Sequence, residues 1–144
     1  MQTPSVPESA TISFRARLRT RWSDEDNHGV LNNAVYLTLV EHSRYLYFTQ
    51  LGILSDEQVP FVLAETTATF LSPGRVGMDL EVAARVARLG NKSFDMEYEI
   101  RHESTPIVKI RAVLVTVDAT LSSCEIPADF RRRVAEFENI PERS

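Results

Sequence analysis

The sequence of 144 residues contains a single cysteine, Cys124. One cysteine cannot form a disulfide within the chain, which fits a reducing compartment, so a cytoplasmic location is expected. Basic residues are also outnumbered, because 16 Lys and Arg stand against 20 Asp and Glu, for a formal net charge of −4. This excess of acid argues against nucleic acid as the main partner.

Long apolar runs and histidine clusters are missing as well. No stretch reaches the ~18 uninterrupted apolar residues of a membrane span, so none is expected. The three histidines, His28, His42 and His102, have neither the spacing of metal ligands nor a nearby cysteine, so we expect no metal and no cofactor. The sequence also lacks the Gly-x-Ser-x-Gly segment of many serine hydrolases.

The residues that are present fit one domain. Hydrophobic residues make up 43% of the chain, which is enough for a sizeable core. Residues 1–10 contain prolines and no apolar run, so they are expected to be a flexible tail rather than a signal peptide. The expected domain covers residues 11–138, and residues 139–144 are expected to be a C-terminal tail.

Five segments show the pattern of strands. In the first, Thr11–Trp22, Phe14 and Leu18 fall on one face and four arginines on the other, which indicates a sheet with one solvated face. The others are Phe61–Leu71, Asp79–Leu89, Ser93–Arg101 and Ile107–Asp118. Short turns separate the last three, so these are predicted to be antiparallel neighbours. The last is the most apolar and is expected at the centre of the sheet.

Two segments show the pattern of helices. One runs from about Leu31 to Leu51 and ends at Gly52, and its apolar residues spread around most of the circumference, which predicts a largely buried helix. A shorter helix is predicted from Pro127, with Arg131–Arg133 on a solvated face. The predicted fold is α+β, an antiparallel five-stranded sheet wrapped around one long helix. Its open sheet edges predict pairing with another subunit.

Carboxylates and amides crowd together where the long helix begins, in the segment WSDEDNHGVLNNAVY, Trp22–Tyr36. Gly29 permits a positive φ or a close approach to a ligand. The first backbone N–H groups of the helix can bind a developing oxyanion, and a nearby carboxylate can act as base or nucleophile. This suits acyl transfer, above all thioester hydrolysis, since a thiol leaves easily as thiolate. The alternative is that these acids and asparagines only cap the helix.

The motifs of the chain resemble those of a known family. The segments RWSDEDNHGVLNNAVYL…EHSR, FLSPGRVGMDLEV, RLGNKSF, VLVTVD and EIPADF are similar, in this order, to those of the hotdog-fold thioesterases of the 4-hydroxybenzoyl-CoA thioesterase-like family. The resemblance covers roughly Ile12 to Val134. It implies a hotdog fold, an acyl-CoA substrate, and a homodimer or homotetramer with the active site between subunits.

The resemblance also implies roles for particular residues. Asp26 matches the catalytic carboxylate and Gly29 the glycine of the turn, while the main-chain N–H of Asn33 falls where the family polarises the thioester carbonyl. Val30 stands where many relatives have histidine. Glu41, on the helix, and Glu65, on the next strand, are alternative carboxylates, because some hotdog enzymes take theirs from these elements.

Coenzyme A is implied as part of the substrate. Lys92 and Ser93 match positions near which the family holds its phosphates, and Arg88 is a neighbour. Two functions therefore stand side by side. The first is hydrolysis of acyl-CoA with Asp26 as general base or as nucleophile. The second is a non-hydrolytic hotdog module that binds acyl-CoA or acyl-carrier protein.

Overall fold

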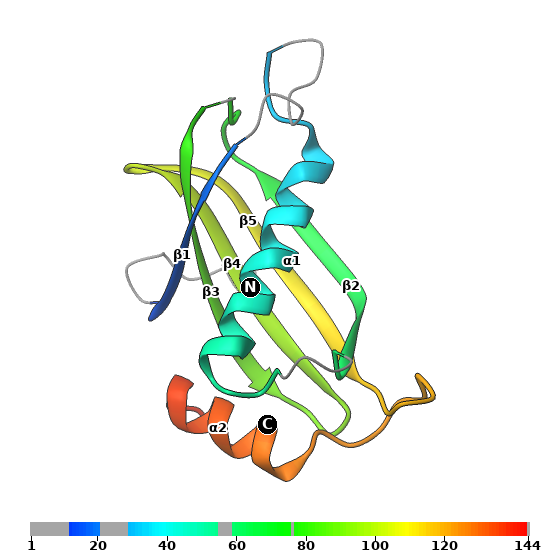
Figure 1. Cartoon of the computed structure of the whole chain (residues 1–144). Coiled ribbons are helices and arrows are strands. Elements are labelled where there is room, and N and C mark those ends of the chain that lie inside the picture. Colours follow the sequence, from blue (N-terminus) through cyan, green and yellow to red (C-terminus); the bar gives the residue numbers. More distant parts are fainter. Residues whose placement is uncertain (1–11, 21–28, 55–58, 76, 144) are drawn as a thin grey trace, which may run out of the picture.

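The sheet and both helices are where the sequence predicts them. The computed structural model describes residues 12–20, 29–54, 59–75 and 77–143. Its elements are β1 (Phe14–Arg19), α1 (Asn33–Gln50), β2 (Phe61–Phe70), β3 (Asp79–Leu89), β4 (Ser93–His102), β5 (Thr105–Thr116) and α2 (Ala128–Glu138). The strands form one antiparallel sheet in the order β1-β3-β4-β5-β2, and α1 lies along one face of it (Figure 1).

The core lies between α1 and the sheet. The alternation predicted for β3 and β4 is confirmed, because Val82, Ala84, Phe94 and Ile100 are all fully buried. The middle strand is β4, however, and not the more apolar β5. An apolar strand needs a neighbour on each side, which β5 has in β4 and β2. On its other face β4 carries Glu97, buried beside Arg85 at 3.3 Å, so its pattern is less apolar.

α1 buries one face only in the single chain. Its buried residues are Tyr36, Val40, Ser43, Arg44, Tyr47 and Phe48. Leu37 and Tyr45, on other sides of the helix, remain 39% and 49% exposed. The prediction of a helix buried around most of its circumference is therefore wrong for one chain, because the sheet covers α1 from one side. No helix in the described ranges is both long and apolar enough to cross a membrane.

α2 closes one end of the core. Phe130 and Val134 are buried, and Pro127, where the sequence predicts the helix to start, is the N-cap residue. The prediction that Arg131 lies on a solvated face is wrong. Its side chain is buried, and its Nη2 donates to the carbonyl oxygen of Gly90 at 2.9 Å. Carbonyl groups of the β3–β4 turn face α2 and need donors, and Arg131 supplies them.

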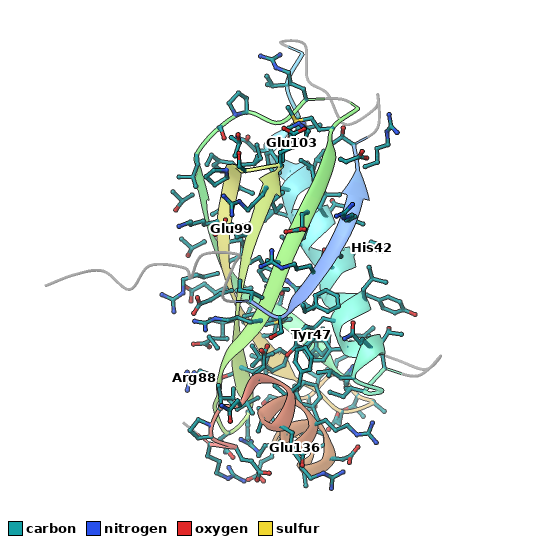
Figure 2. The ribbon with its side chains drawn as sticks, turned by 90° about the vertical axis from the view of Figure 1, so that its left-hand side faces the viewer. His42, Tyr47, Arg88, Glu99, Glu103 and Glu136 are labelled. Atoms are coloured by element: carbon teal, nitrogen blue, oxygen red, sulfur yellow. The ribbon has the colours of Figure 1, made fainter. Side chains whose placement is uncertain are left out.

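The half-buried carboxylate of Glu138, the last residue of α2, joins this helix to α1 and β3. Glu138 Oε2 accepts hydrogen bonds from the Tyr47 hydroxyl of α1 and from the Val86 backbone N–H of β3, both at 2.7 Å. Figure 2 shows Tyr47 between α1 and the sheet, close to α2. Burial raises the pKa of Glu138 above its ordinary value, and the two hydrogen bonds oppose that shift.

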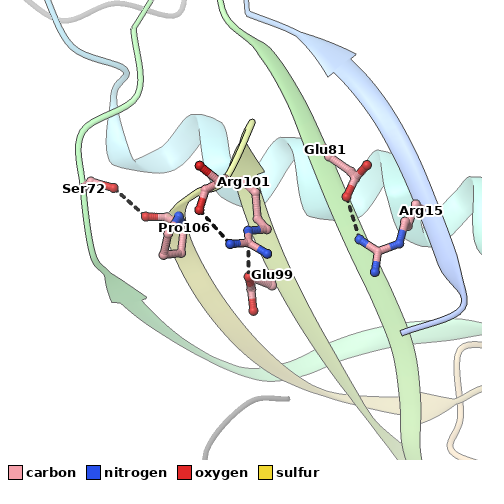
Figure 3. Close-up of polar contacts among 7 residues, drawn as sticks. Arg15, Ser72, Glu81, Glu99, Arg101 and Pro106 are labelled. Carbon is pink, nitrogen blue, oxygen red and sulfur yellow. Dashed lines mark hydrogen bonds and ion pairs between the residues drawn. The ribbon is translucent and has the colours of Figure 1, made fainter. Parts of the chain in front are cut away.

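The face of the sheet turned away from α1 is charged. Arg15 pairs with Glu81 across β1 and β3 at 2.6 Å, and Arg101 pairs with Glu99 of its own strand at 3.3 Å (Figure 3). The cross-strand pair of Arg15 lies on the face of β1 that the sequence predicts to be solvated.

Candidate functional site

The start of α1 is attached to the loop that follows β2. The Leu31 N–H donates to the carbonyl oxygen of Gly74 at 2.8 Å, and Arg75 Nη1 donates to the carbonyl oxygen of Gly29 at 3.4 Å. The Ser72 hydroxyl donates to the carbonyl oxygen of Pro106, at the start of β5 (Figure 3). The loop therefore holds the N-terminal end of α1 at a fixed place over the sheet.

Two glycines make this arrangement possible. Gly29 has φ +77°, a conformation that favours glycine and that the sequence pattern predicted as one option. At Gly74 a Cβ atom would lie 2.8 Å from both Leu31 Cδ1 and the Tyr36 hydroxyl oxygen, so a side chain there would require these neighbours to shift. Burial raises the pKa of Tyr36, and its hydroxyl accepts a hydrogen bond from the Gly74 N–H at 2.9 Å.

One backbone donor in the first turn of α1 has no acceptor among the residues that the structure describes. Asn32 is the N-cap, and its Oδ1 accepts from the Ala34 N–H at 3.0 Å while its carbonyl oxygen accepts from the Val35 N–H at 2.9 Å. Within the described part of the chain, no acceptor is found for the Asn33 N–H. Of the two neighbouring asparagines, Asn32 is thus the N-cap, and Asn33 is the residue whose backbone N–H has no acceptor among the described residues.

An apolar pocket adjoins this donor. Its volume is about 320 Å³, and its lining includes Asn33, Tyr36, Phe70 and Leu71. Phe70 and Leu71 are 49% and 47% exposed, so the pocket is open in the single chain. An apolar wall beside one N–H at the positive end of a helix suits a carbonyl compound with an apolar substituent.

The candidate carboxylates are spread out. Asp26, three positions before Gly29, lies outside the described residues, as do Asp24, Glu25 and His28. Glu41 is exposed and lies eight residues after Asn33, about 12 Å further along α1. Glu65 is exposed on the edge strand β2, just after an irregularity in its pairing with β5. Neither glutamate lines the pocket beside the Asn33 N–H within one chain.

The candidate phosphate-binding residues lie at the other end of the molecule. Lys92 belongs to the β3–β4 turn and Ser93 is the first residue of β4, and Figure 2 shows their neighbour Arg88 beside α2, where α1 ends. The 18 residues of α1 separate this end from Asn33 by about 27 Å. One chain therefore does not bring the two groups of candidate residues together.

The side chains around this turn differ in how far they are engaged. Arg88 pairs with Asp95 at 3.1 Å, and the Gly90 N–H donates to the carbonyl oxygen of Ser93 at 2.7 Å. The side chain of Lys92 is exposed. Sequence reasoning missed two further cations at this turn. Arg131 donates to the carbonyl oxygen of Asn91 at 3.3 Å, and Arg143 donates to the side-chain oxygen of Asn91 at 3.4 Å. Nothing in the run Arg131–Arg133 distinguishes its first member by sequence.

Comparison with known proteins gives a consistent result. The sequence matches the model of the thioesterase superfamily over residues 28–109. A thioesterase from Thermus thermophilus, solved in complex with coenzyme A and Zn, is 30% identical with a TM-score of 0.81, and the match covers 88% of this chain and 95% of that one. This similarity confirms the predicted hotdog arrangement.

Curated relatives carry two kinds of name. An acyl-CoA thioester hydrolase, YbgC, from Escherichia coli O6:H1 is 26% identical over 114 residues, which cover 75% of this chain and 84% of that protein. The chloroplastic acyl-acyl carrier protein thioesterase ATL3 of Arabidopsis thaliana is 29% identical over 126 residues, which cover 83% of this chain. The match spans 66% of the plant protein's length, slightly less than two thirds.

Proposed function

This chain belongs to the thioesterase superfamily, and we propose that it hydrolyses the thioester of an acyl-CoA to a free acid and coenzyme A. The observation that carries the proposal is the Asn33 N–H, which has no acceptor among the described residues and adjoins an apolar pocket. A thioester bound there would direct its oxygen at the positive end of α1 and its acyl group at the apolar wall.

Asp26 supplies the reacting carboxylate in this proposal. It precedes Gly29 by three residues, and Gly29 is held by Arg75 at the start of α1. As general base, Asp26 takes a proton from water while the water oxygen attacks the thioester carbon. As nucleophile, its own oxygen attacks and forms a mixed anhydride, which water then cleaves. In both routes the C–S bond breaks and the thiolate leaves.

The nucleotide of coenzyme A would lie on the β3–β4 turn of a partner subunit. The distance of about 27 Å along α1 between Asn33 and this turn supports a site that two chains share. Lys92 is the best placed cation, because its side chain is exposed and Arg88 is engaged with Asp95. Ser93 adds a hydroxyl. The exposed edge strand β2, with Val62 and Leu63 at 44% and 50% exposure, supports pairing with a second copy.

Two alternatives follow from the same geometry. The thioester can be carried by acyl-carrier protein, as the name of the plant relative says of that protein. The chain can also bind acyl thioesters without cleaving them, because the donor and the pocket serve binding as well as catalysis.

The deciding experiment measures thiol release by the purified chain from a panel of acyl-CoAs and acyl-carrier-protein thioesters. Glu136→Gln, an exposed carboxylate-to-amide change on α2, is the matched control for Asp26→Asn in this assay. Thiol release from acyl-CoA at higher kcat/KM than from the carrier protein supports the proposal. Calorimetric binding of acyl-CoA without thiol release would identify the non-hydrolytic module instead.

A further inference from the structure

The turn between β3 and β4 is held through its carbonyl oxygens, at the end of the sheet where α2 lies (Figure 1). The Gly90 carbonyl oxygen accepts a hydrogen bond from Nη2 of Arg131 at 2.9 Å, and the Asn91 carbonyl oxygen accepts from the same nitrogen at 3.3 Å. The next carbonyl oxygen, of Lys92, accepts from the Thr116 N–H of β5 at 2.9 Å. Arg131 and Thr116 are both buried, so three consecutive carbonyl groups are directed into the protein.

The backbone N–H groups of the same peptide units point the other way. In a planar trans peptide the C=O of one residue and the N–H of the next are directed oppositely, and the described residues contain no cis peptide. The contacts of Arg131 with Gly90 and Asn91 therefore direct the N–H groups of Asn91 and Lys92 away from the protein. Neither N–H has an acceptor among the residues that the structure describes, and both residues are exposed. Successive N–H groups in a turn form a concave site for an anion.

Arg131 keeps a positive charge directly behind this turn. Only 4% of the residue is exposed, and its Nη1 donates to the carbonyl oxygen of Glu142, in the segment after α2. Its acceptors are thus carbonyl groups, and no carboxylate in the described ranges forms an ion pair with it. Because carbonyl groups do not cancel the charge of a guanidinium, Arg131 attracts an anion to the turn as well as orienting the turn.

We propose that Arg131 is a positioning residue for the nucleotide of coenzyme A, because it orients the N–H groups of Asn91 and Lys92 so that they donate to a phosphate. This role rests on the proposed function, in which the nucleotide lies at this turn beside the Lys92 side chain. The planar guanidinium contacts the turn with one nitrogen and the Glu142 carbonyl oxygen with another. A lysine at position 131 keeps the charge but has a single nitrogen, so it cannot keep both contacts in this geometry.

The test is calorimetric titration of the full chain with coenzyme A. We expect Arg131→Lys to weaken binding by about tenfold, and Lys92→Ala to weaken it as well. Arg132→Lys makes the same change at the neighbouring exposed arginine of α2, so it is the matched control and should bind as wild type does. A second readout separates positioning from a role in folding. Because an acyl N-acetylcysteamine thioester lacks the nucleotide, its kcat and KM should be the same for Arg131→Lys and wild type.

The possible results separate this inference from the proposed function. Coenzyme A binding by Arg131→Lys at wild-type strength, with Lys92→Ala weakened, would overturn the positioning role and leave the nucleotide at the turn. Wild-type binding by both variants would place the nucleotide elsewhere and overturn both. Equal losses of turnover with acyl-CoA and with the N-acetylcysteamine thioester would show that Arg131 serves only the fold. Weaker coenzyme A binding by Arg131→Lys, without thiol release by wild type, would support the inference and reject hydrolysis.

A measurement on wild type decides the matter if Arg131→Lys does not fold. In a ¹⁵N-labelled chain titrated with coenzyme A, the amide resonances of Asn91 and Lys92 should shift, because their N–H groups gain a charged acceptor. The amide of Ser104, exposed in the turn between β4 and β5, is the control and should keep its resonance. If coenzyme A saturates the chain and neither the Asn91 nor the Lys92 amide shifts, the N–H groups that Arg131 orients receive no phosphate and the inference is wrong.

Discussion

Tyr36 and Gly74 join α1 to the loop after β2, since the Gly74 N–H donates to the Tyr36 hydroxyl at 2.9 Å. The contact depends on the absence of a side chain at position 74, where a Cβ atom would lie 2.8 Å from that hydroxyl. The same glycine accepts a hydrogen bond from the Leu31 N–H, two residues before Asn33. The placement of the proposed carbonyl-binding N–H thus depends on how closely the loop approaches the helix.

Gly74→Ala should move this loop away from the helix. We expect kcat to fall by about 10- to 100-fold, because a small displacement of a positioned donor is enough for such a loss. Gly77→Ala is the matched control, since Gly77 has φ +82° but no atom within 4 Å of the added Cβ. Both variants should lose about 1 kcal/mol of stability or more, and only Gly74→Ala should lose activity. Equal activity in the two variants would rule out the positioning role.

Asp26→Asn is nearly isosteric and removes the base or nucleophile. Thiol release from acyl-CoA should fall by about 10² to 10⁴ in kcat, with assembly and thermal stability nearly unchanged. Turnover at the wild-type rate would remove Asp26 from the mechanism. Glu65→Gln and Glu41→Gln would then be assayed as the next candidates.

Lys92→Ala should remove binding that is equal in the ground state and the transition state. KM for acyl-CoA should rise while kcat is nearly kept, and the effect should shrink at high salt, where exposed charges are screened. Lys109→Ala on β5 is the matched control, because Lys92 and Lys109 are the only lysines of the sequence. A short thioester without the nucleotide should show no dependence on Lys92. Equal losses with both substrates would place the nucleotide elsewhere.

A site shared between subunits makes complementation possible. Light scattering should give at least twice the 16.3 kDa mass of the chain. Mixed assemblies of Asp26→Asn and Lys92→Ala chains should then contain some sites with Asp26 from one chain and Lys92 from the other. Such mixtures should regain turnover with the low KM of wild type. A mixture whose kinetics equal the sum of the two separate variants would show that each chain forms its own site.

Glu138→Gln should change the pH dependence of stability. The pKa of Glu138 is raised in the folded chain, so its contribution is fully present below the unfolded pKa and is lost as pH rises through the folded pKa. Glutamine keeps an acceptor for Tyr47 and Val86 and cannot ionise. Denaturation midpoints from about pH 4 to 7.5 should therefore fall for wild type relative to Glu138→Gln. A difference independent of pH would show that Glu138 does not titrate in this range.

The strands were predictable because their information is local. Alternation with period two gives β3 its observed bounds, and the short turns fix β3, β4 and β5 as neighbours. The buried arginines were not predictable in this way. Arg44 is buried because Tyr98, 54 positions away, accepts from it, and Arg131 because Gly90, 41 positions away, does. The helical periodicity of a segment does not show which distant residues will accept hydrogen bonds from it.

The candidate site was predictable in part for a related reason. The motif around Gly29 marks the helix start, and Gly29 does adopt a positive φ. The sequence alone could not decide between Asn32 and Asn33 as the cap, because both precede the same apolar run. The contacts that hold the start of α1 in place come from a loop about 40 residues later, at Gly74 and Arg75, which the motif around Gly29 does not include.

The order of the strands has a consequence for synthesis on the ribosome. β1 and β2 are made early but occupy the two edges of the sheet, where Phe14 pairs with Ala84 and Phe61 with Thr116. Neither edge can form until its later partner has emerged, so the hairpins of β3, β4 and β5 are expected to fold first. Until then the apolar stripe of α1 has no sheet to cover it. The nascent chain therefore leaves the apolar stripe of α1 uncovered until the strands up to Thr116 have been made, and chaperones have the most to protect during that time.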